Sequence, residues 1–546
     1  MKKIIYLFIL FVFFRAEAAN LKIDNTKWLY NAEDNVYYQL QIPYCNKPLD
    51  EKFEKLAIFV PEKFMQCSKN NNNTYSCKVN KNAKIKNYTP KTAPIVFPVE
   101  TEGYSSNLPL EEYQSFKKYT DNGIIYIVAG ARGKEHSAPN GVADLKAAIR
   151  FIKYNKKSIC ANTDKIILSG MSGGGAQAAI LAAGGNSSFF KPYLQKIGAL
   201  KKRDDVYGVS VWCPITNLDS ANAAYEWNMG VSREDLSEEE QKVSQNLARE
   251  FAFYVNQKKF KDENGKRLVI SRSPNGEYKE GSYVDYIKNQ IENSLNNFLV
   301  DTEFPYTMEN LENPIVQTRR KYILVKNYRR KYKKPIFKKI TIKEILQKTL
   351  TFDAPKDYID YLNQKNEWVT YDEEKNSVKI TNIDEFSKNL KKAQKPIGAF
   401  DAFDKSTPEN LLFGLNSNPS HFDKMSQRVL YHTQYGKEFE KDLSQKDEFN
   451  NSIQTRLMMY TPLYYLMDSY KEGKKSTLAK HWRIRSGINQ SDTSLTTEVN
   501  LALALKNNKK IKTVDFETVW NKAHVRAERK GDWEDNFIDW ILSLRD

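Results

Sequence analysis

Apolar and polar positions in the first half of the chain follow two alternating periods. Short apolar runs, typical of buried strands, cover residues 94–99, 124–129, 164–169 and 207–212. Between them, apolar residues recur every three or four positions, as in residues 142–154, which indicates helices. Residues 111–119, between the first two of these runs, are predicted to form another helix. A succession of buried strands and amphipathic helices predicts a mostly parallel sheet flanked by helices, the α/β class.

The same rhythm breaks off and later returns. Residues 231–455 are charged, rich in tyrosine and mainly helical in pattern, and after them residues 482–487 and 513–519 again have the pattern of strands. We therefore predict one α/β core, formed by residues 91–230 and 456–546 and interrupted by a large, mainly helical lid insertion. This lid insertion is not expected to be an independent domain.

The start of the chain has the pattern of an export signal. A basic tripeptide, an apolar run over residues 4–14 and the sequence AEA at 16–18 predict a cleaved signal peptide in residues 1–18. The apolar run is too short to cross a bilayer, so we expect a periplasmic or secreted bacterial protein without a membrane span. Alternating residues in the next segment, 19–90, predict antiparallel strands in an N-terminal β-rich part of the same domain.

Five cysteines fit an exported protein with one disulfide. Cys67 paired with Cys77 would close a short asparagine-rich loop, and Cys45 paired with either of them is the alternative. Cys160 and Cys213 are expected to be small buried apolar side chains.

Amino-acid composition and net charge limit the class of protein and the partners that it is expected to bind. Apolar residues make up 40% of the chain and aromatic residues 12%, which excludes an intrinsically disordered protein. The net charge of +17 is best explained by a lysine-rich surface, because no zinc, helix-turn-helix or RNA-binding motif indicates nucleic acid. Residues 319–343 contain twelve Lys or Arg and no Asp or Glu. We interpret them as a solvated face, with an anionic surface as the alternative partner.

The strongest candidate for chemistry is the sequence GMSGG at residues 170–174. It lies between the predicted strand at 164–169 and a small-residue helix at 175–183, the context in which G-x-S-x-G forms a nucleophile elbow. Such a tight turn exposes the serine oxygen above the strand ends and leaves no room for a side chain two positions away. Ser172 is the predicted nucleophile, and the backbone N–H of Gly173 is a predicted oxyanion donor.

A nucleophilic serine needs a histidine base and an acid, which occur in the order Ser, acid, His in α/β hydrolases. Of the five histidines, only His524 follows the last predicted strand and precedes the last helix. Asp492, in the loop after the preceding strand, is the predicted acid. Asp219, after residues 207–212, is the alternative acid, and either aspartate could instead cap a helix.

The remaining site predictions concern the oxyanion hole and cofactors. A second oxyanion donor is expected near Gly103 or Tyr104, in the loop after the first parallel strand. The sequence contains no Walker A loop, dinucleotide fingerprint or zincin motif, so neither a cofactor nor a metal is expected.

These segments resemble the tannase and feruloyl-esterase-like branch of the α/β hydrolases. The resemblance covers about residues 90–230 and 455–546, and it lies in 125–133 (IYIVAGARG), 139–145 (PNGVADL), 170–177 (GMSGGGAQ), 213–219 (CPITNLD), 224–227 (AYEW), 485–487 (RSG) and 490–493 (QSDT). It implies hydrolysis of esters of aromatic acids through Ser172, Asp492 and His524. Some members of the family have two acids in a D-x-D-T run, the first of them catalytic, and this chain has Gln490 there. The acid role therefore moves to Asp492, or the triad is weakened.

The sequence as a whole predicts an exported serine hydrolase that cleaves small carboxylic esters, with aromatic, hydroxycinnamic or gallic-type acyl groups among the candidates. Two alternatives stay open. One is a serine peptidase on the same fold, and the other is a catalytically weakened binding protein whose basic lid engages an anionic surface polymer.

Overall fold

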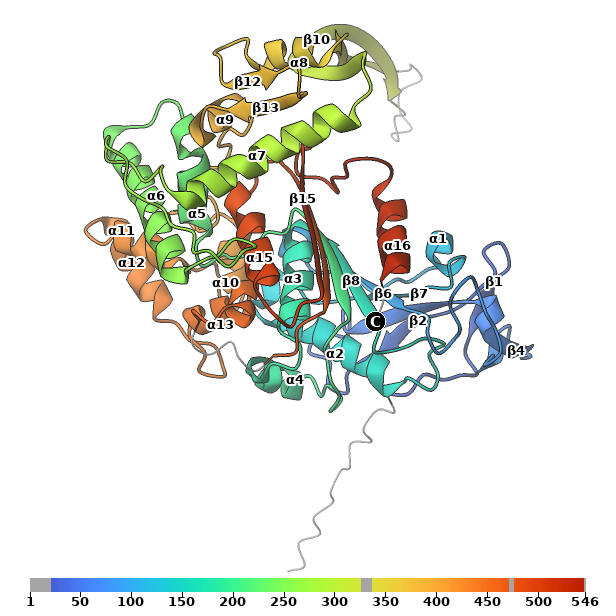
Figure 1. Ribbon diagram of the computed structural model, residues 1–546. Helices are drawn as coiled ribbons and strands as arrows, with labels where there is room; N and C mark the ends of the chain where they lie inside the picture. Colours follow the sequence, from blue (N-terminus) through green and yellow to red (C-terminus); the bar gives the residue numbers. More distant parts are fainter. Residues whose placement is uncertain (1–20, 326–335, 471–475, 545–546) are drawn as a thin grey trace, which may run out of the picture. The chain divides into compact units, whose positions relative to one another are not determined.

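Nine strands form one mixed sheet at the centre of the larger of the chain's two compact units (Figure 1). The computed structural model describes residues 21–325, 336–470 and 476–544, and within 309–325 and 336–348 it describes the backbone only. The predicted signal peptide in residues 1–18 and the side chains of the basic run at 319–343 lie outside the described residues. Their roles stay predictions.

The strand order follows the α/β-hydrolase prediction. From one edge to the other it is β1 (Leu29–Asn31), β2 (Val36–Pro43), β3 (Lys55–Pro61), β7 (Ile125–Ala129), β6 (Ile95–Val99), β8 (Ile166–Met171), β9 (Gly208–Trp212), β14 (His481–Gly487) and β15 (Thr513–Val519). The six strands from β7 to β15 are parallel, and β1 to β3 join them antiparallel. Each predicted apolar run thus forms a strand, and the predicted fold class is confirmed.

Helices cover both faces of this sheet (Figure 1). The helices of the chain are α1 (Lys117–Thr120), α2 (Asn140–Tyr154), α3 (Ser172–Ala183), α4 (Lys191–Lys196), α5 (Ala221–Met229), α6 (Glu238–Lys258), α7 (Ser282–Asp301), α8 (Pro355–Leu362), α9 (Ile383–Asn389), α10 (Pro408–Phe413), α11 (Lys424–Val429), α12 (Gln434–Leu443), α13 (Ile453–Met459), α14 (Pro462–Leu466), α15 (Leu495–Lys506) and α16 (Trp533–Ser543). Helices α2, α3 and α15 lie on one side of the sheet, and α1 and α16 lie on the other.

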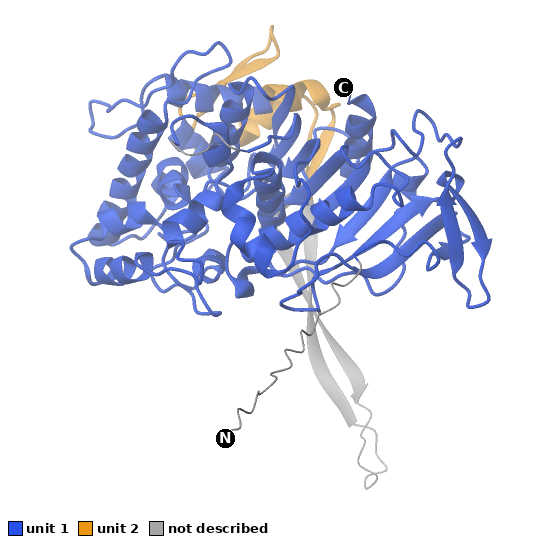
Figure 2. Cartoon of the chain, turned by 90° about the horizontal axis from the view of Figure 1, so that it is seen from below, with its two compact units in different colours: residues 1–294, 383–546 blue, residues 295–382 orange. Residues whose placement is uncertain are grey.

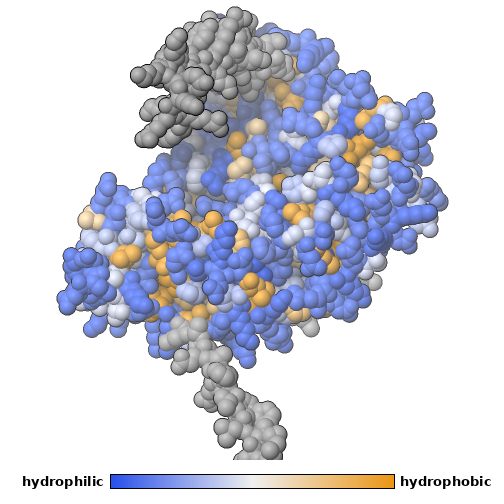
Figure 3. Space-filling model, turned by 180° about the vertical axis from the view of Figure 1, so that it is seen from behind, coloured by the Kyte–Doolittle hydropathy of each residue, from blue (hydrophilic) through white to orange (hydrophobic). Residues whose placement is uncertain are grey.

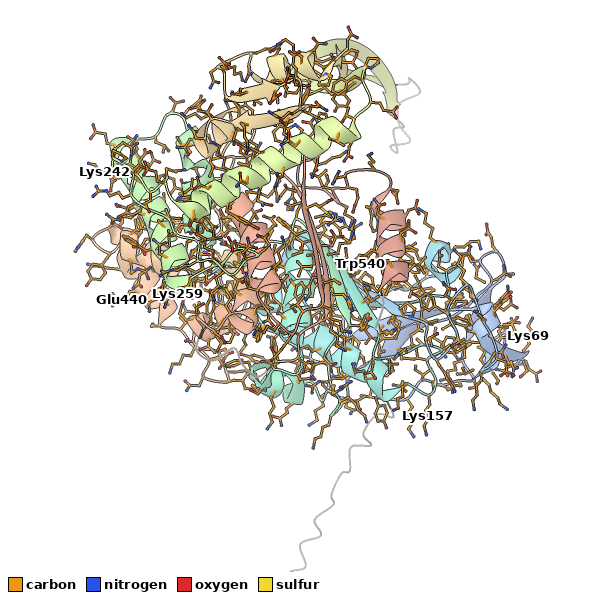
Figure 4. The ribbon with its side chains drawn as sticks, viewed as in Figure 1. Lys69, Lys157, Lys242, Lys259, Glu440 and Trp540 are labelled. Atoms are coloured by element: carbon orange, nitrogen blue, oxygen red, sulfur yellow. A yellow bond between two sulfur atoms is a disulfide. The ribbon has the colours of Figure 1, made fainter. Side chains whose placement is uncertain are left out.

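The apolar residues of α16 explain why this helix packs on the sheet. Phe537, Ile538 and Ile541 recur at helical spacing and are buried against strand residues such as Val96 and Ile167. Trp540 of the same helix stacks on Phe537 and packs at the edge of this cluster (Figure 4). Burying such side chains is the main favourable term for the layered core.

One predicted helix is wrong. Residues 111–116 form an irregular segment, and only α1, which begins at Lys117, is helical. The Tyr113 hydroxyl donates to Asp34 at 2.5 Å, and the Phe116 ring stacks on Tyr126 at 4.0 Å between ring centroids. These long-range contacts hold the segment against one face of the sheet, and local helical preference does not outweigh them.

The lid insertion is less uniformly helical than predicted. Its first part forms α6, whose N-terminus has a capping box made by Ser237 and Glu240. Residues 295–382 make up a second compact unit, coloured orange in Figure 2, and contain two antiparallel hairpins. The hairpin strands are β10 (Tyr306–Val325), β11 (Ile336–Phe352), β12 (Val369–Asp372) and β13 (Ser377–Ile380). Runs such as ITI at 340–342 favour strands because β-branched side chains fit a pleated surface.

The cysteines pair as one of the two alternatives predicted. Cys67 and Cys77 form a disulfide between directly opposite positions of β4 (Met65–Lys69) and β5 (Tyr75–Val79), with their Cα atoms 4.1 Å apart. Cys45 is free and buried, which excludes it from this disulfide. Cys160 and Cys213 are buried as predicted.

The surface is largely polar. The face shown in Figure 3 is mostly hydrophilic, with hydrophobic residues in separate patches. Charged side chains such as Lys157, Lys242 and Glu440 point outward from the ribbon (Figure 4). In the described ranges, no helix is both long enough and apolar enough to cross a membrane.

Candidate active site

The nucleophile candidate lies at the sharp turn from β8 to α3. Ser172 is the first residue of α3, is buried, and has a φ of +56°, a left-handed conformation that non-glycine residues rarely adopt. A Cβ atom at Gly170 would lie 2.6 Å from the carbonyl oxygen of Gly174. Glycine is therefore required there, as the elbow motif predicts.

The predicted oxyanion donors lie next to one another. A Cβ atom on Gly173 would be 2.6 Å from the backbone nitrogen of Tyr104 and 3.1 Å from that of Gly103. Gly103 and Tyr104 both have positive φ, +62° and +55°, so the loop after β6 turns sharply at this point. The Tyr104 hydroxyl anchors the loop by donating to the Ile215 carbonyl at 2.6 Å. The backbone nitrogens of Gly103 and Tyr104 thus lie close to Gly173, the residue that follows Ser172, and the oxyanion hole predicted there stays a prediction.

The histidine candidate contacts two of the residues discussed above. His524 lies in the loop after β15, and its Nδ1 atom is 2.6 Å from Oε1 of Gln490. Oδ2 of Asp492 lies farther from the same nitrogen, at 3.7 Å. The short hydrogen bond of His524 is therefore made to the amide, and Asp492 is close enough to act through its charge.

Gln490 is itself held by a buried polar cluster. Its Nε2 atom donates to Oγ of Ser486 at 2.7 Å and to Oε1 of Glu498 at 2.6 Å. The same oxygen of Glu498 accepts from Thr493 Oγ1 at 3.2 Å. Lys391 Nζ donates to the backbone carbonyl of Gln490. All five residues are almost completely buried.

Two of these residues, Glu498 and Lys391, were missed by the sequence reasoning. Glu498 is the only acidic residue in α15, a helix whose residues are otherwise buried and uncharged up to its last position, Lys506. An isolated acid in a buried helix is a signal for a polar partner, because an unpaired buried charge is costly. Lys391 lies in the lid insertion, where lysines are common, so the sequence does not distinguish it from its neighbours.

Burial and nearby charges set the ionisation of the site. Burial lowers the pKa of His524, the positive charges of Lys395 and Lys391 lower it further, and Asp492 opposes them. Burial also lowers the pKa of Lys391 to about 8, against the opposing charge of Glu498. His524 is therefore held in its neutral form, the state a general base needs.

A second pair of charges lies close to this site. Burial lowers the pKa of Lys395, whereas Glu409 and Asp492 raise it. Burial raises the pKa of Glu409, and Lys395 opposes that shift. Because Lys395 also acts on His524, these charges belong to one electrostatic neighbourhood.

The alternative acid lies in a different cluster. Oδ2 of Asp219 accepts a hydrogen bond from the Tyr470 hydroxyl at 2.6 Å, and the Tyr254 hydroxyl is 3.0 Å from that of Tyr470. Burial raises the pKa of Asp219, and the charge of Lys258 opposes the shift. Within the described part of the chain, no hydrogen bond or ion pair joins Asp219 to His524. The described residues also contain no group of three His, Cys, Asp or Glu side chains arranged to hold a metal ion.

Comparisons with known proteins agree with the fold described above. The family model BD-FAE matches residues 85–260, and no curated protein matches the chain. A tannase from Fusobacterium nucleatum has a TM-score of 0.70 and 26% identity, over 96% of this chain and 100% of that one. A tannin acyl hydrolase from Lactobacillus plantarum has a TM-score of 0.65 and 24% identity, and a tannin acyl hydrolase in complex with ethyl gallate has 0.66 and 24%, each over 93% of both chains. The chain therefore has the α/β-hydrolase fold and is similar to tannases of known structure.

Proposed function

We propose that the protein is an exported serine hydrolase that cleaves carboxylic esters through an acyl-enzyme. The observation that carries this proposal is Ser172 at a left-handed elbow, beside the backbone nitrogens of Gly173 and Tyr104. Ser172 Oγ attacks the acyl carbon while His524 accepts its proton, and His524 then returns the proton to the leaving alcohol. Water, deprotonated by the same histidine, attacks the acyl-enzyme and releases the acid.

Asp492 is the proposed acid of the triad. Its carboxylate lies 3.7 Å from Nδ1 of His524, and its charge favours the imidazolium that forms as Ser172 loses its proton. The oxyanion of the tetrahedral intermediate would be stabilised by the backbone N–H groups of Gly173 and of Gly103 or Tyr104.

We propose esters of aromatic acids as the substrate class. One structure similar to this chain is a tannin acyl hydrolase in complex with ethyl gallate, and another contains 3,4-dihydroxybenzoate. In this chain, the charges of Lys395, Glu409 and Asp492 act on one another beside His524. Such groups can hydrogen-bond to polar substituents of an aromatic ring. Export rests on the pattern of residues 1–18.

The triad assignment is tested with two matched substitutions, Asp492→Asn and Asp219→Asn. We expect Asp492→Asn to lower kcat/KM about tenfold, because a charge within 4 Å of a histidine is worth about one pKa unit. Asp219→Asn should stay within about threefold of the wild type, since no charge near His524 changes. Turnover of p-nitrophenyl acetate and of aromatic methyl esters measures both. The reverse result would make Asp219 the acid.

Covalent labelling of the wild-type protein tests whether it is a serine hydrolase at all. A fluorophosphonate probe should form an adduct on Ser172, located by mass spectrometry. An intact protein with neither turnover nor adduct would instead be a binding protein on this fold, the alternative that Gln490 in the acid position favours.

The pH dependence of kcat/KM follows from the pKa of His524. Because burial lowers this pKa below its ordinary value of 6.5, the neutral base persists below pH 6.5, and the low-pH limb of the profile should lie below that value. Lys395→Met removes a positive charge and should move the limb upward, whereas Asp492→Asn should move it downward. Profiles with an uncharged ester measure both shifts. A wild-type limb above pH 6.5 would contradict the expectation.

A further inference from the structure

An unbroken hydrogen-bond chain runs from His524 into the protein interior. His524 Nδ1 is 2.6 Å from Oε1 of Gln490, and Nε2 of Gln490 is 2.6 Å from Oε1 of Glu498. Gln490 and Glu498 are 1% and 0% exposed, so water does not compete for these bonds. In place of a carboxylate bonded directly to His524, this chain has the amide of Gln490, and the carboxylate of Glu498 bonds to the other end of that amide.

We propose that Gln490, held by Glu498, is the residue that positions His524 for catalysis. The proposal rests on the ester hydrolase function above and deepens it. Asp492 remains a charge beside the imidazole, while Gln490 determines which way the ring points and which nitrogen carries the proton.

The two ends of the amide explain how this works. Only the NH₂ end of Gln490 can donate, and both its acceptors, Ser486 Oγ and Glu498 Oε1, lie on the interior side. The carbonyl end must therefore face His524, and it can only accept. His524 must then carry its proton on Nδ1, which leaves Nε2 free as the base for Ser172.

The cluster around Glu498 is built to keep the carboxylate in place. Ser486 Oγ and Thr493 Oγ1 lie 3.1 and 3.2 Å from the oxygen that accepts from Gln490. The titratable groups that act on Glu498 are Lys391 and the buried thiol of Cys213. Those that act on His524 are Asp492, Lys395 and Lys391. The amide of Gln490 lies between the Glu498 carboxyl and the imidazole of His524 and joins the two by hydrogen bonds.

A set of three variants tests the role of the amide. Gln490→Ala removes the acceptor, so kcat should fall about 10²- to 10⁴-fold with little change in KM, since both tautomers of His524 become accessible. Glu498→Gln removes the charge but can keep an oxygen as acceptor, so kcat should fall about 3- to 10-fold and the low-pH limb should move downward.

The swapped pair Gln490→Glu with Glu498→Gln moves the carboxylate next to His524. Its shape is preserved, because Ser486 and Thr493 hydroxyls can accept as well as donate. We expect kcat to recover above that of Glu498→Gln and the low-pH limb to rise by about one to two pH units above the wild type. Glu54→Gln, a buried carboxyl next to β3 and outside this cluster, is the matched control and should leave the pH profile unchanged.

The result that overturns the proposal is a wild-type kcat and pH profile in Gln490→Ala and in the swapped pair. A second readout does not depend on turnover. In protein labelled with ¹⁵N-histidine, the His524 signal, assigned by its loss in His524→Gln, should show the Nδ1–H tautomer in the wild type and a mixture in Gln490→Ala. An unchanged tautomer in Gln490→Ala also overturns the proposal. Absence of turnover in the wild type would reject the ester hydrolase function while the NMR result still decides the positioning.

Discussion

Replacing Ser172 by alanine is expected to lower kcat/KM for p-nitrophenyl acetate by about 10⁴- to 10⁶-fold. The substitution removes the only atom proposed to attack the acyl carbon, so the covalent route is lost rather than slowed. The elbow itself should persist, because Ser172 lies at φ +56° and alanine meets the same backbone strain there as serine. The variant should therefore keep the wild-type melting temperature within a few degrees.

The matched control is Ser169→Ala, which removes another buried hydroxyl three residues earlier on β8. Its activity should stay within about threefold of the wild type. The fluorophosphonate adduct should be present in Ser169→Ala and absent in Ser172→Ala. Residual turnover near the wild-type level in Ser172→Ala would show that another group attacks the ester, and the elbow would then be a structural turn.

Adding a single methyl group at Gly173 should have the next largest effect. Its Cβ would lie 2.6 Å from the backbone nitrogen of Tyr104 and 3.1 Å from the backbone atoms N of Gly103 and O of Thr101. Real Cβ atoms do not approach backbone this closely, so the loop after β6 must move away from Ser172. We expect Gly173→Ala to lower kcat about 10²- to 10³-fold, the usual cost of losing one oxyanion donor.

The same substitution should lower the free energy of unfolding by about 1–3 kcal/mol, as overpacking of a rigid region does. Gly265→Ala separates this effect from the loss of activity. Gly265 has a φ of +80°, and a Cβ atom there would have no neighbour within 4 Å, so alanine strains the backbone without touching the site. That control should lose about 1 kcal/mol of stability and keep the wild-type kcat. Unchanged kcat in Gly173→Ala would place the oxyanion hole elsewhere.

The fold could be predicted from the sequence where local pattern and burial agree. Strands such as β8 and β14 are almost entirely buried because both of their faces are covered, and an apolar run such as that of β8 is visible without a structure. Residues 111–119 show the opposite case. Their pattern favours a helix, but Tyr113 and Phe116 contact partners elsewhere in the chain, and the backbone of residues 111–116 is irregular. The secondary structure of the lid insertion was harder to predict from the sequence, because its short hairpins and its helices share a polar, tyrosine-rich composition.

In the candidate site, too, some features could be predicted from the sequence and others depend on tertiary contacts. The elbow at Ser172 is local, since five consecutive residues and their two flanks suffice to form it. The place of His524 follows from the order of strands along the chain. Strand order could not predict which residue bonds to Nδ1 of His524. Gln490 and Asp492 lie two residues apart, and both lie near that nitrogen.

The α/β core, the elbow and the candidate residues could all be derived from the amino-acid sequence alone, because each depends on short-range patterns within one segment. Folding in three dimensions was needed to establish that Gln490 contacts Nδ1 of His524, that Glu498 and Lys391 contact Gln490 in turn, and that Asp219 joins a separate tyrosine cluster. Hydrogen bonds depend on distances of a few ångströms and on donor direction. Residues from β14, α15 and the lid insertion reach those distances only after the chain has folded.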